Sequence, residues 1–338
     1  MKVIDISKSK QITFQFRSAK DYKNTEGKGW SFSNVYSFEE IRDLYILLME
    51  NGYIESVEKF TAKRVIPLVM PKGKSLTSRR VREILNAMVN FNWFERNTNG
   101  CNYWLTTKTP LFLSESLGKE LTDCELDIFK KVFFEYERFR EYLSLYHIDN
   151  NSDDVIINSI PIYSFSAEDR YTDVFFKSLD DNVDLMCIKD EDSSGQKSSG
   201  FKSFWDVFVS WAQKLNLMEK FNSNIFNMRL SNGKSFSCSY FNSSKDVCLP
   251  PLPCILKDLY PNRKVIDVNK LIFKICIKYR KPVKEVKEYI ILQYSIYKKY
   301  ISIVRTSEIF INRSEKKDDN AIAYPKYENS FISHLIIQ

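Results

Sequence analysis

The stretch KSLTSRRVREILNAMVNF, residues 74–91, constrains the fold of this chain more than any other. Its apolar residues Val81, Ile84, Leu85 and Met88 recur at i, i+3, i+4 and i+7, which is the spacing of one helix face. At 100° per residue, the opposite face carries the polar residues Arg79, Arg82, Glu83, Asn86 and Asn90. The pattern predicts an amphipathic helix that buries one stripe and presents a basic first turn outward.

A short hairpin is predicted directly after this helix, in FNWFERNTNGCNYWLT, residues 91–106. Two aromatic-rich runs flank the polar NTNG, and Asn99 and Gly100 both accept the positive φ angles of a tight hairpin turn. In so small a sheet, large rings bury the most area at each position, so we expect Phe94 and Trp104 to cover the helices.

Two further helices are predicted upstream. Residues 37–52 contain Ser37 as an N-cap, with Glu40 three residues later as a capping-box partner, and residues 57–66 form a second helix stopped by Pro67. Helices followed by a ribbon that closes in Tyr-Trp-Leu-Thr, residues 103–106, resemble a winged helix-turn-helix domain. The resemblance covers residues 37–106 and implies a recognition helix for the DNA major groove and a wing beside it.

The next segments predict a long helix and a second helix–hairpin pair. Residues 121–148 contain Thr122 and Glu125 as a capping box, and this helix either supports the first domain or pairs two chains. Strands are expected in ITFQF (12–16), SIPIYSF (159–165) and VDLMCIK (183–189). A helix over residues 201–221 and a hairpin about Asn232-Gly233 suggest a degenerate second winged-helix unit.

The C-terminal third predicts another helix–hairpin unit after a linker. Residues 243–264 contain four prolines and are interpreted as the linker. Asp267 is expected to cap a helix whose buried stripe is Val268, Leu271, Ile272, Ile275 and Tyr279. Pro282 would begin the next helix, and a ribbon with Arg-Thr-Ser (305–307) at its tip would follow.

These patterns together predict a mainly α-helical chain with small antiparallel hairpins, of class α+β, built from tandem winged-helix-like units. The expected domains are residues 1–148, 149–250 and 251–338. A chain of 338 residues is long for one core, which agrees with several domains.

The charges of the chain are distributed in blocks. Residues 59–82 hold eight Lys or Arg and no acid, and residues 263–299 hold eleven basic residues against three acids. Residues 168–192 have the reverse balance, with nine acids and three bases. Such basic islands favour a polyanionic partner, although a solvated Lys-rich face would have the same composition.

Little in the sequence indicates catalysis. The two histidines, His147 and His334, lie apart from Cys or carboxylate clusters, and neither common phosphate-binding glycine loop occurs. The seven cysteines form no metal-ligand spacing and fit free thiols in the cytoplasm, and no apolar run resembles a signal peptide or membrane span. An alternative is a metal-dependent nuclease using Asp184 with Lys189 and acids 190–192, although its acid-x-lysine triplet is missing.

We therefore expect a non-catalytic cytoplasmic protein that binds double-stranded DNA, as a regulator or as the DNA-recognition subunit of a replication or antiphage defence complex. Its composition, rich in Lys, Asn and Ile, is associated with bacteria and phages. No cofactor, metal, membrane or small-molecule substrate is expected, while a protein partner or homodimer is. A protein–protein scaffold is the other main interpretation. The candidate DNA contacts are Lys63, Arg64, Lys72, Lys74, Thr77, Ser78, Arg79, Arg82, Asn86, Arg96, Asn99, Lys270, Lys274, Lys278 and Lys281.

Overall fold

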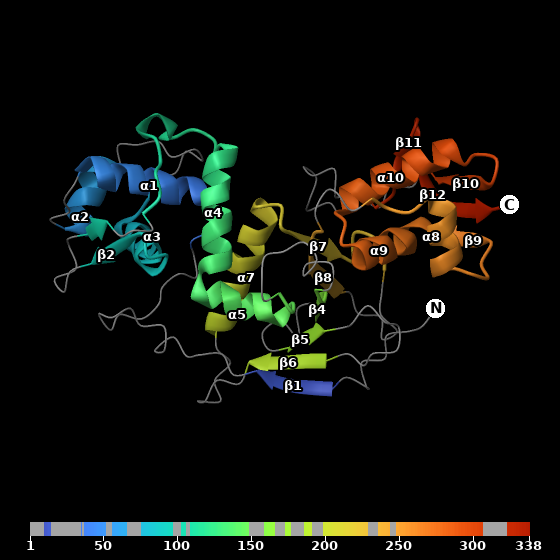
Figure 1. Cartoon of the computed structure of the whole chain (residues 1–338), viewed down its shortest axis with the longest axis horizontal. Helices are drawn as coiled ribbons and strands as arrows, with labels where there is room; N and C mark the ends of the chain where they lie inside the picture. The colour runs from blue at the N-terminus through green and yellow to red at the C-terminus, as the bar shows by residue number, and fades with distance from the viewer. Residues whose placement is uncertain are drawn as a thin grey trace. The chain divides into compact units, whose positions relative to one another are not determined.

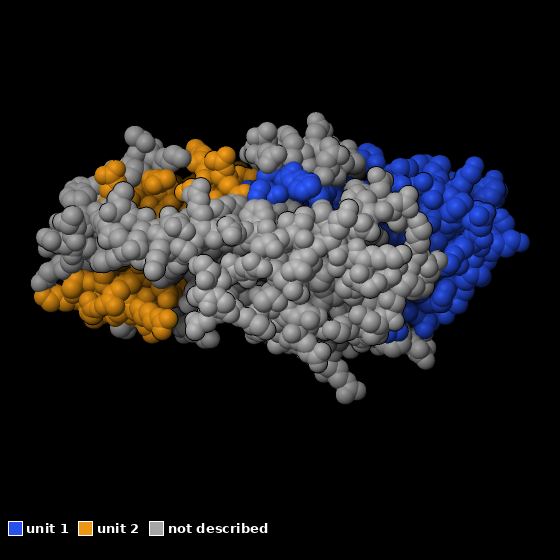
Figure 2. All heavy atoms as spheres, turned by 90° about the horizontal axis from the view of Figure 1, so that it is seen from below, with its two compact units in different colours: residues 1–14, 143–190, 216–338 blue, residues 15–142, 191–215 orange. Residues whose placement is uncertain are grey.

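The chain is a mixture of helices and strands of class α+β (Figure 1). The computed structural model describes residues 10–14, 35, 37–51, 56–65, 76–96, 103–105, 109–148, 159–165, 173–176, 186–190, 199–228, 236–243, 248–306 and 323–338. Two compact units divide the chain: unit 1 contains residues 1–14, 143–190 and 216–338, and unit 2 contains residues 15–142 and 191–215 (Figure 2). Residues on both sides of position 250 thus share unit 1. The expected domain boundaries after residues 148 and 250 stay a prediction.

The part of unit 2 that the structure describes consists of helices and one two-stranded ribbon. Its elements are α1 (Phe38–Asn51), α2 (Val57–Phe60), the π-helical turn η2 (Thr61–Val65), α3 (Ser78–Asn90), β2 (Phe94–Arg96), β3 (Tyr103–Leu105), the 3-10 turn η3 (Ser114–Ser116), α4 (Asp123–Glu135), the first part of α5 (Glu137–Leu145) and α7 (Ser199–Lys214). The predicted apolar stripe of α3 is confirmed, because Val81, Ile84, Leu85 and Met88 are all buried. The Oγ of Ser37 accepts the amide of Glu40 at 3.3 Å, as expected of an N-cap.

The core of unit 2 is built of aromatic rings around Trp211 of α7. Its indole Nε1 donates to the carbonyl of Val35 at 2.8 Å, and its ring meets those of Phe38, Phe129 and Phe139 at 4.6, 6.1 and 5.4 Å. Trp211 has no exposed surface, so its one polar atom needs this hydrogen bond. The apolar helix predicted from residue 201 onward therefore supplies the centre of unit 2.

The predicted long helix over residues 121–148 is wrong in one respect, because it breaks into α4 and α5 at Tyr136. Tyr136 takes an extended conformation, with φ −68° and ψ 119°. In one continuous helix, Phe133 and Phe139 would point about 120° apart. The break allows both rings to pack on Phe208, at 5.0 and 5.5 Å. The predicted capping box of Thr122 and Glu125 is confirmed at the start of α4.

The ribbon after α3 forms as predicted, with Phe94 buried, while the side chain of Trp104 lies outside what the structure describes. The antiparallel register pairs Phe94 with Leu105 and Glu95 with Trp104, and directly opposed residues lie on the same face. Trp93, just before β2, is 2 % exposed, and its ring centroid lies 6.0 Å from that of Tyr45. The turn at Asn99-Gly100 lies outside the described residues.

A buried ion cluster fastens α1 to the loop before α4. The guanidinium of Arg42 donates to the Asp43 carboxylate at 2.9 Å and to the Glu125 carboxylate at 3.3 Å, and it also donates to the carbonyl of Lys119 at 2.6 Å. The amide of Gly118, at φ +74°, donates to Asp43 at 3.2 Å. Burial raises the pKa of Asp43 in spite of the opposing charge of Arg42.

Unit 1 contains a six-stranded sheet with the order β1-β6-β5-β4-β8-β7. Its strands are β1 (Lys10–Phe14), β4 (Ile162–Phe165), β5 (Asp173–Phe176), β6 (Met186–Asp190), β7 (Met218–Asn222) and β8 (Phe236–Phe241). β1 runs parallel to β6, and the other pairs are antiparallel. This sheet is larger than the small hairpins that we predicted, and it joins distant segments. The strands expected in ITFQF, SIPIYSF and VDLMCIK are confirmed within a few residues.

The expected helix over residues 201–221 and the hairpin after it need correction. α7 ends at Lys214, Asn216 takes φ 56°, and β7 begins at Met218. Leu215 and Met218 are both 2 % exposed. β8 therefore pairs with β7, from Met218↔Phe241 to Asn222↔Ser237, rather than with residues next to Asn232-Gly233. Asn232 and Gly233 lie in the connection, outside the described residues.

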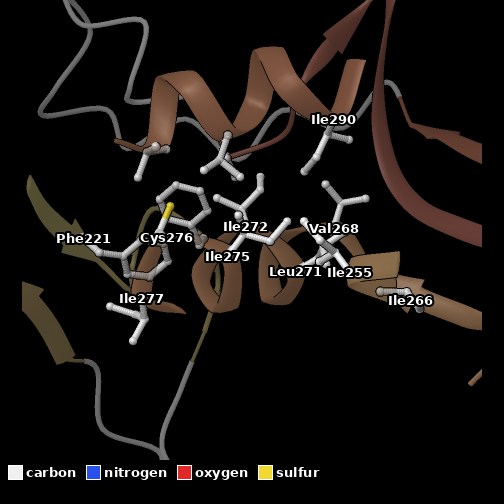
Figure 3. Packing of buried hydrophobic residues seen from close by; sticks show 14 of the residues in the cluster. Phe221, Ile255, Ile266, Val268, Leu271, Ile272, Ile275, Cys276, Ile277 and Ile290 are labelled. Atoms are coloured by element: carbon white, nitrogen blue, oxygen red, sulfur yellow. The ribbon is translucent and has the colours of Figure 1, made fainter. Parts of the chain in front are cut away.

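The C-terminal part of unit 1 has a second hydrophobic layer around α9. Its elements are α8 (Leu252–Leu259), β9 (Val265–Asp267), α9 (Val268–Tyr279), α10 (Val283–Ile296), β10 (Ile301–Thr306), β11 (Lys326–Tyr327) and β12 (Ser330–Ile337). Ile290 of α10 packs over Val268 and Leu271 of α9, with Ile255 of α8 beside them (Figure 3). Asp267 caps α9 by accepting the amide of Lys270 at 3.2 Å, as predicted.

The four-proline segment 243–264 is not a linker. It contains α8, whose Leu252, Ile255 and Leu256 are buried. Pro251 is the N-cap and Pro253 lies in the first turn, where a helix has no amide partner to lose. The prolines therefore begin a helix instead of excluding one.

The predicted C-terminal ribbon is also corrected. Arg305 and Thr306 lie within β10 and not at a tip, because they pair with Ile332 and Phe331 of β12. β12 also pairs with β11 and β9, which makes a four-stranded sheet. The apolar stripe of α9 is confirmed except for Tyr279, which is half-buried.

Candidate nucleic-acid interface

The first two turns of α3 present two exposed arginines, Arg79 and Arg82. Thr77 is the N-cap, and its Oγ1 accepts the amide of Arg80 at 3.3 Å. The side chain of Arg79 is 85 % exposed and that of Arg82 is 54 % exposed. Ser78 is half-buried between them and the cap. The predicted outward face therefore exists at the N-terminal end of α3.

Carboxylates hold the arginines of this face in place. Glu83 forms an ion pair with Arg79 at 3.4 Å, Glu40 of α1 pairs with Arg80 at 3.0 Å, and Glu58 of α2 pairs with Arg82. Arg80 is only 20 % exposed, whereas Arg79 and Arg82 keep most of their donors toward solvent. Of these pairs, only Arg82–Glu58 is more than half exposed on both sides, and a pair this exposed is weak, so a phosphate can replace the Glu58 carboxylate.

Glu83 is a correction to the predicted polar face. We expected it on the outside of α3, but the residue is 8 % exposed. Its carboxylate lies between Arg79, one turn earlier, and Arg80 at 3.9 Å. These two cations offset the cost of burying its charge. Glu83 therefore fixes the arginines and is not available to a base edge.

The turn η2 carries two more candidate residues. Lys63 and Arg64 are exposed, while Thr61 and Val65 on the same turn are buried. The Oγ1 of Thr61 donates to the carbonyl of Val57 at 2.6 Å. α2 contacts α3 and η2 contacts α1 within unit 2, so η2 belongs to the same helical cluster as α3.

The structure describes only two of the remaining five candidate residues in unit 2. Asn86 is half-buried on α3, and Arg96 lies in β2 opposite Tyr103. Lys72, Lys74 and Asn99 lie outside the described residues. Sequence reasoning missed the acids Glu40 and Glu58. The basic run between residues 59 and 82 contains no acid, so its counter-charges had to come from neighbouring helices.

Lys270, Lys274 and Lys278 of α9 and Lys281, two residues after its end, lie in unit 1, and the four do not form one stripe. Lys274 lies over the ring of Tyr260 at 4.5 Å, and Lys278 pairs with Asp258. Both are exposed, while Lys270 is half-buried. Lys281 is not exposed, contrary to what its spacing from the other lysines predicts: it is 4 % exposed and pairs with Glu285 at 3.6 Å.

The position of Lys281 follows from the end of α9. Arg280 takes the left-handed conformation with φ 54°, which turns the chain away from the helix before Lys281. The carbonyl of Lys281 then accepts the hydroxyl of Tyr240 at 3.0 Å. Residue 281 therefore no longer continues the spacing of residues 270, 274 and 278.

The described residues show no group of three metal-ligating side chains. Cys124, Cys238, Cys248, Cys254 and Cys276 are free thiols. His147 is exposed at the end of α5, and His334 lies in β12 with Nδ1 3.1 Å from the Ser333 hydroxyl. Among the residues proposed for the nuclease alternative, Lys189 and Asp190 lie in β6. Asp184 and the acids at positions 191 and 192 lie outside the described residues.

No family model, curated protein or solved structure matches this chain. Among the helices that the structure describes, none combines the length and apolar character that a bilayer crossing requires.

Proposed function

We propose that this chain binds double-stranded DNA without catalysing a reaction, and that α3 of unit 2 is the reading helix. In this proposal it acts as a regulator or as the DNA-recognition subunit of a larger complex. The observation that carries the proposal is the pair of exposed guanidiniums of Arg79 and Arg82 on the first turns of a capped amphipathic helix.

The geometry of unit 2 supports this proposal. The major groove is about 12 Å wide and admits one helix, whose N-terminal residues reach the base edges. An arginine there can donate both ends of its planar fork to one guanine. Lys63 and Arg64 on η2 would then contact phosphates, and the β2–β3 ribbon takes the place of a wing. Helices packed on α3 and followed by this ribbon are consistent with a winged-helix unit.

The tandem part of the proposal is supported by the order of elements in the C-terminal part of unit 1. There α8, α9 and α10 precede the sheet of β10 and β12, with Lys274 and Lys278 exposed on α9. In this proposal these lysines contribute phosphate contacts without reading bases. Their loss should weaken binding to all duplex sequences by similar factors.

Fluorescence anisotropy with a labelled random-sequence duplex tests the proposal. Arg79→Ala/Arg82→Ala should weaken binding by about tenfold or more, because each charged contact contributes one to several kcal/mol. The matched control is Lys130→Ala/Lys131→Ala, which removes two positive charges from α4 of the same unit. With about six phosphate contacts, the wild-type log-log salt slope should be near −5. Equal affinities of the two variants would remove α3 as the reading helix.

A scaffold function is the second candidate, because the segment before α4 exposes two large apolar side chains. Leu111 is 83 % exposed and Leu113 is 56 % exposed, only two residues apart. Exposed apolar residues that lie together often mark a protein interface. Light scattering of the purified wild type and of Leu111→Ser/Leu113→Ser checks for self-association. A scaffold would also show no duplex binding at low salt.

A further inference from the structure

A cluster of tyrosines and cations lies on unit 1, where the end of α10 meets β10 and β11 (Figure 1). The rings of Tyr294 and Tyr327 meet edge to face, with centroids 5.2 Å apart. The ammonium of Lys298 lies 5.8 Å from the Tyr294 centroid and 5.5 Å from that of Tyr327. The guanidinium of Arg305 lies 5.7 Å from the Tyr327 centroid. We call these four residues the tyrosine–cation cluster.

The cluster and its neighbours carry more positive charge than their own acids neutralise. Lys298, Lys299 and Lys326 are exposed, and none of them forms a salt bridge among the described residues. Arg305 pairs with Glu328 at 3.0 Å, and this is the only acid in residues 291–306 and 323–338. The interaction with Tyr327 raises the pKa of Lys298. The surface therefore attracts anions.

An exposed aromatic ring continues this surface along the chain. Tyr300 is 64 % exposed, and it lies in a turn in which its amide donates to the carbonyl of Tyr297 at 2.9 Å. The exposed Lys299 precedes it, and Ile296, at the end of α10, is 61 % exposed. Most of the surface of Tyr300 therefore faces solvent. Its ring can serve as a platform for a flat ligand group.

We propose that the tyrosine–cation cluster, together with Lys299 and Tyr300, binds single-stranded nucleic acid. Cations beside tyrosines follow a phosphate backbone, while an open ring stacks on an unpaired base. Duplex DNA hides its base faces within the stack, so it would use the lysines but not Tyr300. An acidic peptide would likewise use only the charges. This surface is distinct from α3 and does not depend on its role.

The test uses the full-length protein and a labelled oligo-dT of about 20 nucleotides. Lys298→Ala/Lys299→Ala should weaken binding and lower the salt slope by about 1.4, since each phosphate contact on a single strand contributes about 0.7. Tyr300→Leu keeps an apolar side chain but removes the ring, and it should weaken binding about fivefold or more. Tyr300→Phe keeps the ring and should bind like the wild type. Lys257→Ala/Lys264→Ala, which removes two exposed lysines elsewhere in unit 1, is the matched charge control.

Two further comparisons separate the outcomes. An abasic oligomer, which has the same phosphates but no bases, should bind more weakly than oligo-dT. Arg79→Ala/Arg82→Ala should weaken duplex binding and leave oligo-dT binding nearly unchanged, so that failure of either surface is recognised on its own. Equal binding of abasic oligomer and oligo-dT, or of Tyr300→Leu and Tyr300→Phe, would overturn the proposal. A competition experiment gives the third test. If polyglutamate displaced the labelled oligo-dT at the same concentration as an unlabelled oligonucleotide of equal charge, the surface would recognise charge alone, which would also overturn the proposal.

Discussion

The guanidinium of Arg82 on α3 forms an ion pair with the carboxylate of Glu58 on α2, across 24 positions of the chain. Both side chains are more than half exposed, at 54 % and 57 %. The pair therefore contributes little to stability, but it fixes the direction of an arginine on the proposed reading face. Glu58 also places a negative charge where a phosphate backbone would approach.

This arrangement predicts that Glu58→Gln tightens duplex binding. The substitution removes a repulsive charge and releases Arg82 for the DNA, which should increase affinity by about two- to fivefold at low salt. Glu135→Gln, an exposed acid at the end of α4, is the control and should have a smaller effect. Anisotropy titrations at about 50 and 300 mM salt measure both. Unchanged or weaker binding by Glu58→Gln would show that Glu58 does not oppose a bound duplex.

The buried Arg42 should be essential for the stability of unit 2. Arg42→Met keeps most of the side-chain volume but leaves the carboxylates of Asp43 and Glu125 buried without their cation. Breaking a buried ion cluster in this way costs about 3–5 kcal/mol. All five tryptophans fall within the residue ranges of unit 2, so tryptophan fluorescence during urea unfolding follows this unit. A loss below about 1 kcal/mol would mean that the cluster has no structural role.

Asp43 gives unit 2 a pH dependence with a defined sign. Its pKa is raised above the ordinary value of 3.8 by burial, so the folded state holds the proton more tightly than the unfolded state. The associated stability is present below 3.8 and is lost as the pH rises through the raised pKa. Asp43→Asn stays neutral. The unfolding free energy of this variant, relative to wild type, should therefore increase between about pH 4 and pH 7. A decrease would contradict the raised pKa.

The capping box of α4 should make a measurable contribution to stability. The Oγ1 of Thr122 accepts the amide of Glu125 at 3.3 Å, and the Glu125 carboxylate accepts the amide of Thr122 at 2.8 Å. Thr122→Ala removes the first bond and should cost about 1 kcal/mol in urea unfolding, while Thr122→Ser keeps the hydroxyl and should cost much less. Equal unfolding midpoints of the two variants would argue against the cap.

Local patterns in the sequence predicted helix positions well. The apolar stripe of α3, the Thr122 capping box and the Asp267 cap depend on residues within one or two turns, and the structure contains all three. The α4–α5 break at Tyr136 was missed because its reason is the distant ring of Phe208. The pairing of the strands was also missed, because the partners lie far apart in the sequence. β10 pairs with β12, about 30 residues later, and β1 pairs with β6 across much of the chain.

The sequence predicted which arginines of the candidate site are exposed, but it did not predict which carboxylates pair with them. Arg79 and Arg82 are exposed, as the helical spacing indicates. The spacing also placed Glu83 outside, but ion pairs with two arginines hold it inward. The helical spacing likewise predicted that Lys281 would lie beside Lys274 and Lys278. It does not, because α9 ends at the left-handed residue Arg280 and Lys281 is buried. The roles of all these residues in binding stay predictions.

The affinity of Arg79→Ala/Arg82→Ala for a random-sequence duplex, compared with Lys130→Ala/Lys131→Ala, tests the central claim most directly. The two variants lose the same charge from the same unit, so only the position of the charge differs. We predict that the α3 variant binds about tenfold or more weakly than wild type, while the α4 variant changes by less than about threefold. Equal losses in both variants, or no duplex binding by the wild type at low salt, would contradict the account.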